Sequence, residues 1–498
     1  MPSFNELPAE LYDEIFQHVV YPSWEALNHI SRSPTRDDIH SFDHLININR
    51  RPLEHVIAWW PRPGDIQLRL VSRAFNRAML RVYFRYEGAV LLASEEHALE
   101  RVEEHLIPED GKSAWSIADS VEKFRVELCP RGYSKWSIFH ADHGKMNEWE
   151  KRDGKDEKLD AGAERLKNLL DKATLARAVS RMPKLASLIV NLNEEWRAED
   201  PAWDYDAENE EEMRGLKLKL DLLQSVREGV ANLFLPVEFT VGGAQHLELL
   251  TYLRLALPGA YDFAYINKRM SEAVVMRLRH LYLEFIDGTG PGGDLDYTRS
   301  RQSGSDDGDE DYPLSNMQRM HPNTEYMHSM CSLVNRCKNL ESLGLVGTQC
   351  IDLEGLNWHS ANGGLKNIYI CRAVTAADKM LQLLSSGYGE GSCAVEAFDI
   401  EDVQLMDSTW ESVFARLQSS STLVYFHVWN LVYSKHGTSA HLAENNSRPW
   451  ENVSEIWTEN RGDQQRIWDI IEAVMERGGS VSDVMASFDF DEDEDEYI

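Results

Sequence analysis

The chain has 498 residues, of which 43% are hydrophobic, and 83 acidic residues against 51 basic ones give a formal net charge of −32. Nucleic acids and anionic membranes are bound through clustered Lys and Arg, so this charge argues against both classes of partner and favours a protein partner. The length allows about three domains, and the apolar fraction is sufficient for a substantial core.

The opening residues, MPSFNELPAE, show neither the basic nor the apolar region of a secretory signal. No apolar run reaches the ~18 residues of a membrane span. We therefore expect a cytoplasmic or nuclear protein without disulfides. The cysteines lack CxxC pairing and are interpreted as isolated buried thiols: Cys129, Cys331, Cys337, Cys350, Cys371 and Cys393.

Two short amphipathic helices are predicted near the start. ELPAELYDEIFQHV (6–19) has apolar residues at four-residue spacing, and Pro8 suits a first helical turn. LRLVSRAFNRAMLRVYF (68–84) has a second apolar face, opposite an arginine ladder that is either solvated or a docking surface for an acidic partner. Helices this short cannot bury enough apolar surface alone, so the rest of the chain or another protein must complete it.

The two stretches resemble the F-box. The residues that match its pattern are Leu7, Pro8, Glu10, Leu11, Ile15, Phe16, Leu68, Val71, Ser72, Arg73 and Phe75. The resemblance implies a small helical module that packs into a Skp-type adaptor of a cullin-based ubiquitin ligase, while the remainder of the chain recruits an unknown protein substrate. It implies adaptor contacts through Leu7, Pro8, Leu11, Ile15, Leu70, Val71 and Phe75. The connection 20–67 is longer than is usual in the family.

A six-residue pattern, apolar-x-x-apolar-x-apolar, recurs downstream. The eight hexamers are VEKFRV (from Val121), LASLIV (Leu185), LTYLRL (Leu250), LRHLYL (Leu278), LESLGL (Leu340), LKNIYI (Leu365), VEAFDI (Val395) and LVYFHV (Leu423). The alternating end of each hexamer predicts a strand with one face buried, and the first apolar residue leads into it. From residue 340 the spacings are 25, 30 and 28 residues, at or just beyond the range of leucine-rich repeats.

Helical periodicity is predicted between and after the strands, at 166–182, 211–234, 323–337, 408–418 and 465–477. This alternation resembles fungal F-box proteins with an irregular leucine-rich-repeat-like C-terminal region. It implies an α+β or α/β fold, with an F-box-like helical module followed by an irregular α/β solenoid. An ordinary mixed α/β domain is the alternative.

The expected domains are a helical module at 1–95 with its insertion at 20–67, a repeat-like region at 96–440 and a helical cap at 441–480. Acidic loops near 199–212 and 287–312, and an acidic tail at 487–498, lack the apolar content needed to order themselves.

Signals of catalysis are sparse. His140 and His143 lack a third metal ligand at suitable spacing, DGTGPGGD lacks a phosphate-loop context, and no Gly-x-Ser-x-Gly elbow occurs. We therefore expect a non-catalytic recruiting subunit without cofactor or metal. The alternatives are an interaction scaffold outside a ubiquitin ligase, with the N-terminal helices docked on the chain's own body, and a hydrolase with an undetected carboxylate pair.

Overall fold

The computed structural model describes most of the repeat-like region. The described residues are 89–93, 98–107, 117–128, 164–170, 173–192, 210–235, 247–287, 315–385, 393–406, 408–429, 431–435, 438–441 and 461–477. Both expected N-terminal helices, the insertion at 20–67, the adaptor-contact residues and the acidic tail lie outside these residues.

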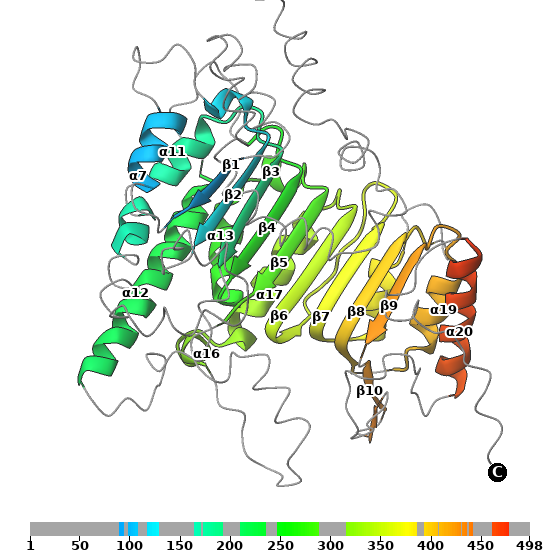
Figure 1. The fold of residues 1–498 in the computed structure, drawn as a ribbon. Helices are drawn as coiled ribbons and strands as arrows, with labels where there is room; N and C mark the ends of the chain where they lie inside the picture. The colour runs from blue at the N-terminus through cyan, green and yellow to red at the C-terminus, as the bar shows by residue number, and fades with distance from the viewer. Residues whose placement is uncertain are drawn as a thin grey trace, which may run out of the picture.

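A single β-sheet organises the described chain (Figure 1). The strands are β1 (Ala89–Leu92), β2 (Lys123–Leu128), β3 (Ser187–Leu192), β4 (Tyr252–Leu257), β5 (His280–Phe285), β6 (Ser342–Asp352), β7 (Asn367–Thr375), β8 (Ala397–Leu405), β9 (Tyr425–Trp429), β10 (Val432–Lys435) and β11 (Thr438–His441). From β1 to β9 they pair in chain order, and every pairing is parallel. β10 continues along the end of β8, and β11 pairs antiparallel with β10.

All eight hexamers form the strands that the sequence predicts, and the mixed helix-and-strand class is confirmed. Each of strands β2 to β9 begins two residues after the first apolar residue of its hexamer. Those first residues are all buried: Val121, Leu185, Leu250, Leu278, Leu340, Leu365, Val395 and Leu423. β1 lies before the first hexamer.

One backbone arrangement recurs at each of the seven junctions between successive hexamers. The carbonyl of a hexamer's second residue accepts the N–H groups of the second and third residues of the next hexamer. Thus the Glu122 carbonyl accepts from Ala186 and Ser187, at 2.8 and 3.0 Å. The acceptor residues are Glu122, Ala186, Thr251, Arg279, Glu341, Lys366 and Glu396. This shared junction sets the common register of the strands.

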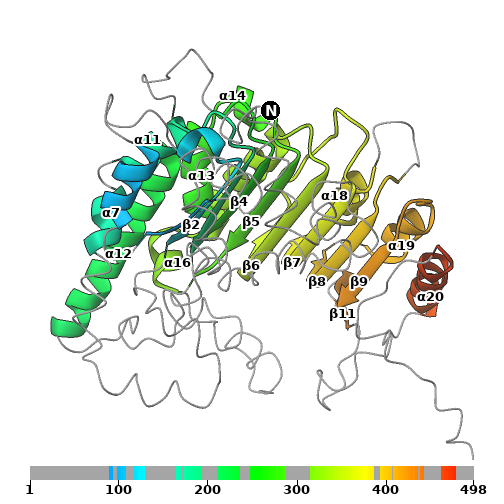
Figure 2. The same cartoon turned by 45° about the horizontal axis from the view of Figure 1, so that its top comes forward.

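Helices lie on one side of the sheet (Figures 1 and 2). The helical elements are α7 (Ala98–Arg101), η3 (Val102–Leu106), η4 (Ile117–Ser120), α11 (Thr174–Ser180), α12 (Glu210–Asn232), α13 (Ala260–Arg269), α14 (Glu272–Val275), α16 (Asn316–Met320), α17 (Asn323–Arg336), α18 (Ala377–Leu383), α19 (Glu411–Gln418) and α20 (Arg461–Glu476). Their apolar faces and the inward side chains of the strands form one continuous core. No described helix combines the length and apolar character required to cross a membrane.

Polar contacts join helices that pack side by side. Buried Asp262, in the first turn of α13, accepts the backbone N–H of Gly259 at 3.0 Å and pairs with Arg227 of α12 at 2.6 Å. Arg336, at the end of α17, donates to the carbonyls of Asn267 and Met270 at 2.8 Å each. A cation at the last carbonyls of a helix satisfies orphan acceptors and the helix dipole together.

Three sequence predictions need correction. The helix predicted over 166–182 is interrupted, because Ala173 adopts a left-handed conformation (φ 50°) immediately before α11. The acidic loop predicted to end at 212 ends earlier, since α12 begins at Glu210. At the start of the other predicted acidic loop, Asp287 is buried and accepts a hydrogen bond from the Ser315 hydroxyl.

The helix predicted as the C-terminal cap is present as α20. It packs against α19 and β9 at the end of the sheet (Figure 2). Its buried side chains recur at helical spacing: Ile467, Ile470, Ile471 and Val474. α20 therefore covers apolar surface that the last strand and helix would otherwise expose.

Candidate functional site

One face of the sheet carries no helix or strand among the described residues, and we call it the open face (Figure 1). Because strand side chains alternate, the residues of the open face are those between the core positions. In register from β2 to β9, its first row is Lys123, Ser187, Tyr252, His280, Ser342, Asn367, Ala397 and Tyr425. Its middle row is Arg125, Ile189, Arg254, Tyr282, Gly344, Tyr369, Asp399 and His427.

Two tyrosines meet across a glycine at the centre of the open face. Tyr282 and Tyr369 lie on either side of Gly344 in the same row. Residues two strands apart are separated by about 9.6 Å, yet the two ring centroids are only 6.1 Å apart. The ring of Tyr282 therefore leans over Gly344, where a Cβ atom would lie 2.1 Å from its Cδ2. Both rings are less than a tenth exposed.

Arg254 extends this aromatic pair toward β4. Its guanidinium carbon lies 4.7 Å from the centroid of the Tyr282 ring, and its Nη2 donates to Glu284 Oε2 at 2.7 Å. Burial raises the pKa of the Tyr282 and Tyr369 hydroxyls well above their ordinary value, so both remain neutral. Neutral phenols and a paired guanidinium are suited to binding rather than to proton transfer.

The first row contains a hydrogen-bonded chain beside the tyrosines. The Asn367 side-chain amide donates to Ser342 Oγ at 2.9 Å, and Ser342 Oγ lies 2.9 Å from His280 Nδ1. Desolvation lowers the pKa of His280, which favours the neutral imidazole. The Ser342 hydroxyl can then donate its proton to Nδ1 while it accepts from Asn367.

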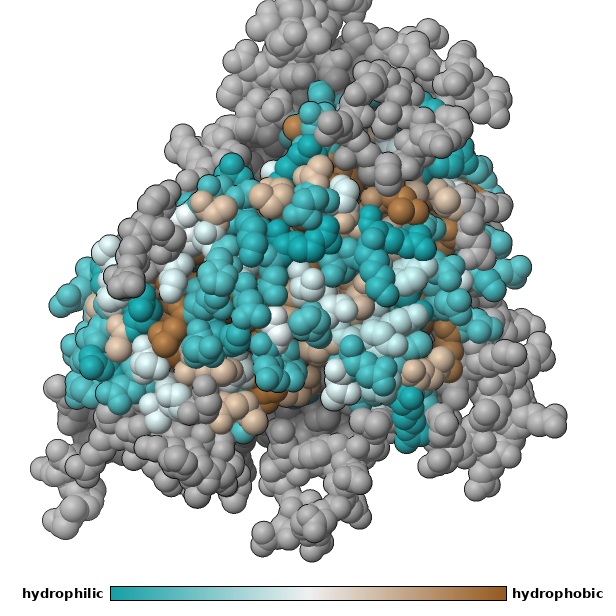
Figure 3. All heavy atoms as spheres, turned by 180° about the vertical axis from the view of Figure 1, so that it is seen from behind, coloured by the Kyte–Doolittle hydropathy of each residue, from teal (hydrophilic) through white to brown (hydrophobic). Residues whose placement is uncertain are grey.

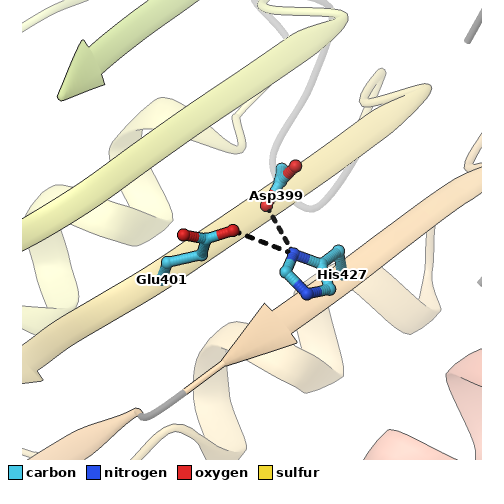
Figure 4. Close-up of side chains that lie close together, drawn as sticks. All are labelled: Asp399, Glu401 and His427. Carbon is cyan, nitrogen blue, oxygen red and sulfur yellow. Dashed lines mark hydrogen bonds and ion pairs between the residues drawn. The ribbon is translucent and has the colours of Figure 1, made fainter. Parts of the chain in front are cut away.

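A titratable cluster lies at the β8–β9 end of the open face (Figure 4). Asp399 and His427 are directly opposite in register, and Glu401 is two residues further along β8 on the same face. His427 Nδ1 lies 2.8 Å from Asp399 Oδ1 and 3.5 Å from Glu401 Oε1. Cys371 Sγ lies 3.7 Å from the other oxygen of Glu401. We call Asp399, Glu401 and His427 the carboxylate–histidine cluster.

The opposite end of the open face is also an ordered ion-pair network. Arg125 pairs with Glu127, and Asn191 Nδ2 donates to Glu127 Oε1 at 3.3 Å. Basic and acidic side chains thus occur at β2–β5, whereas the cluster at β8–β9 places two carboxylates together. The open face is polar and aromatic along its length, and its side chains hold one another in place.

The helix-bearing side of the sheet is seen from behind in Figure 3. Its visible surface is mostly hydrophilic, and its hydrophobic atoms form small separate groups. The exposed large apolar side chains of the described chain are Leu235, Leu249, Met276, Met320, Met406, Trp468 and Met475. Scattered exposed apolar residues of this kind are ordinary on a protein surface.

The thiols fit the sequence prediction with one exception. Cys331, Cys337, Cys371 and Cys393 are buried, but Cys350 is exposed, so the expectation of a buried thiol is wrong there. Burial raises the pKa of Cys331 and of Cys337 to about 12, which keeps both as inert thiols at neutral pH. Cys129, His140 and His143 lie outside the described residues.

None of the residues proposed from the sequence to contact the adaptor can be located, because all seven lie outside the described part of the chain. The carboxylate–histidine cluster is not among the sites predicted from the sequence. Asp399 and His427 each occupy the fifth position of successive hexamers, and in a parallel in-register sheet those positions are neighbours. Alignment of the hexamers would have placed them together.

No protein-family model matches the chain, and neither does any curated protein or solved structure.

Proposed function

We propose that the chain is a non-catalytic substrate-recognition subunit of a Skp–cullin–F-box type ubiquitin ligase. The N-terminal module binds the adaptor, and an irregular leucine-rich-repeat-like solenoid binds a protein target on the open face. The ubiquitin-transfer chemistry belongs to other subunits. The observation that carries the proposal is the open face, a long parallel sheet surface of ordered polar and aromatic side chains.

The regularity of the sheet supports a repeat architecture. The same pair of backbone hydrogen bonds recurs at all seven hexamer junctions, although the chain length between hexamers varies widely. In repeat proteins each unit packs only on its neighbours, so connections on the outer side tolerate changes in length. From β1 to β9 each strand pairs in parallel with the next strand of the chain, as expected when each unit packs on its neighbours.

The dimensions of the open face suit a protein partner. Across β2 to β9 the strand spacing of about 4.8 Å gives a length of roughly 34 Å. A third row, two residues beyond the middle row, includes Glu127, Asn191 and Glu284. Three rows give a width of roughly 20 Å, so the area is close to the ~800 Å² that each partner contributes to a standard interface. Tyrosine and arginine are enriched among residues that dominate binding energy, and the open face presents both types in the partly buried Tyr252 and Arg125.

The N-terminal part of the proposal is supported by the F-box resemblance alone. Its test is co-purification of the full chain with a Skp-type adaptor. Wild-type protein is expected to retain the adaptor, whereas the double substitution Leu11→Asp and Ile15→Asp places two charges on the apolar helix face and should abolish retention. Glu14→Gln, on the polar side of the same predicted helix, is the matched control and should leave retention unchanged. Equal retention by all three proteins would refute adaptor binding through this helix.

A scaffold that acts outside a ubiquitin ligase is the second candidate, because the open face would serve it equally well. In that case the N-terminal helices dock on the chain's own body. Limited proteolysis between residues 95 and 115 separates the candidates. An independent module is released intact after cleavage, whereas a docked module stays associated with the C-terminal fragment.

A further inference from the structure

The carboxylate–histidine cluster brings three metal-ligating groups to one point of the open face (Figure 4). One ligand atom from each of Asp399, Glu401 and His427 lies within 4.8 Å of the other two. Two of the atoms are carboxylate oxygens and the third is an imidazole nitrogen. Oxygen and nitrogen donors in this combination are typical ligands of first-row divalent cations.

The spacing of the donors fits a shared ion. Two ligands that each lie about 2.1 Å from a tetrahedral metal are roughly 3.4 Å apart. His427 Nδ1 lies 2.8 Å from Asp399 Oδ1 and 3.5 Å from Glu401 Oε1, which brackets that separation. Small side-chain rotations would therefore admit the ion without a change in the backbone.

The two strands hold the donors in place. Asp399 of β8 and His427 of β9 are register partners in the parallel pair, so their Cα positions are fixed by the sheet. Glu401 uses one oxygen toward His427, and its other oxygen accepts a hydrogen bond from Cys371 Sγ on β7. Such a second contact orients a ligand before the metal arrives.

Electrostatics at Asp399 also favours a cation. Asp399 is only 6% exposed, and His427 is its one hydrogen-bond or ion-pair partner among the described residues. A carboxylate removed from water requires a compensating positive charge or several hydrogen bonds. Glu401, two residues away on the same face, adds a second carboxylate that one divalent ion would neutralise together with the first.

We propose that Asp399, Glu401 and His427 bind one divalent transition-metal cation of the zinc class, with Nδ1 as the imidazole donor. Magnesium and calcium suit the cluster less well, because both prefer oxygen ligands and one of the three donors is an imidazole nitrogen. The bound ion would join β8 to β9 and leave its remaining coordination positions directed away from the core.

The direct test is calorimetric titration of Zn²⁺ into the metal-stripped full-length chain at neutral pH. Wild-type protein is expected to contain a site that is weakened at least about 100-fold by His427→Gln and by Glu401→Gln, since even the loss of an outer contact costs 10–100-fold. His280→Gln is the matched control, because His280 is a half-buried histidine of the same face that bonds to Ser342 rather than to a carboxylate. It should leave the affinity unchanged.

In this titration, two outcomes would overturn the proposal. Either the wild-type chain binds no Zn²⁺, or both cluster variants bind it as tightly as the wild type. X-ray absorption on the zinc-loaded wild-type chain provides a second test that requires no variant to fold. A first coordination shell of oxygen and nitrogen that includes imidazole is expected, whereas a sulfur shell would assign the zinc to the cysteines instead.

Discussion

Gly344→Ala is expected to destabilise the protein, although alanine is ordinarily better than glycine inside a strand. The added Cβ would lie 2.1 Å from Tyr282 Cδ2 and 2.5 Å from Cε2, which no rotamer adjustment of alanine can relieve. The ring of Tyr282 must therefore leave its position over β6. It would then lose its contact with the Arg254 guanidinium and its stacking on Tyr369.

The expected cost follows from those two contacts. A cation–π contact at a desolvated site contributes about 1–2 kcal/mol, and an aromatic pair contributes about 0.5–1.5 kcal/mol beyond its buried area. Replacement of glycine by alanine in a strand returns about 0.5–1 kcal/mol. The free energy of unfolding should therefore fall by roughly 0.5–3 kcal/mol, which overlaps the usual cost of overpacking.

A double-mutant cycle with Tyr282→Ala isolates this mechanism. Urea unfolding of the full chain, followed by circular dichroism, is measured for the wild type, each single variant and the double variant. Once the ring is absent, Gly344→Ala should raise the urea midpoint, because only the gain in strand propensity remains. If Gly344→Ala costs the same with and without the Tyr282 ring, the proposed stacking across Gly344 is not responsible.

Three further predictions concern the core, the pH response and the interrupted helix. Trp358→Phe deletes the 2.8 Å hydrogen bond that the buried indole Nε1 donates to the Cys337 carbonyl. It should therefore lower the free energy of unfolding by about 1–3 kcal/mol, and an unchanged urea midpoint would contradict this expectation. His280 has a lowered pKa in the folded chain, so the unfolded state binds its proton more readily and stability should fall as pH decreases below about 6.5. His280→Asn should reduce that slope of urea midpoint against pH, and an identical slope would refute the assignment. Ala173→Gly should raise the free energy of unfolding by up to about 1 kcal/mol, because glycine relieves the left-handed conformation, and this gain is measured as a higher melting temperature. Ala178→Gly inside α11 should lower the free energy of unfolding by a similar amount.

The strands could be predicted because the apolar positions of each hexamer are the positions whose side chains are buried. Its last two apolar positions point into the core, and its first apolar residue is buried before the strand begins, so eight strands and their faces follow from one pattern. The ends of the strands could not be predicted in the same way. Arg372 and Asp402 adopt positive φ within β7 and β8. At this point the paired positions pass from Cys371 and Glu401 directly to Ala373 and Val403. The side chains that point into the core therefore lie at even-numbered positions before this point in β8 and at odd-numbered positions after it. A backbone bulge of this kind depends on the neighbouring strand rather than on local composition.

The open face could be predicted only in part from the sequence. The residues between the core positions show no periodicity of their own, so Tyr282, Tyr369 and Asp399 do not differ locally from solvated strand residues. Their association depends on pairing between segments about thirty to ninety residues apart, which the parallel register supplies. The requirement for glycine at position 344 could not be predicted either, because it arises from the Tyr282 ring that lies over this residue.

The central claim, that the open face selects a protein target while the N-terminal module holds the adaptor, is tested most directly by quantitative mass spectrometry of proteins captured with the full chain while proteasomes are blocked. Three baits are compared: the wild type, the open-face variant Tyr252→Ala with Ile189→Ser, and the helix-side control Met320→Ser with Met475→Ser. We predict that all three baits capture the Skp-type adaptor equally and that a specific set of other proteins is lost with the open-face variant alone. Capture of the same proteins in the same amounts by the open-face variant and the wild type would contradict the account.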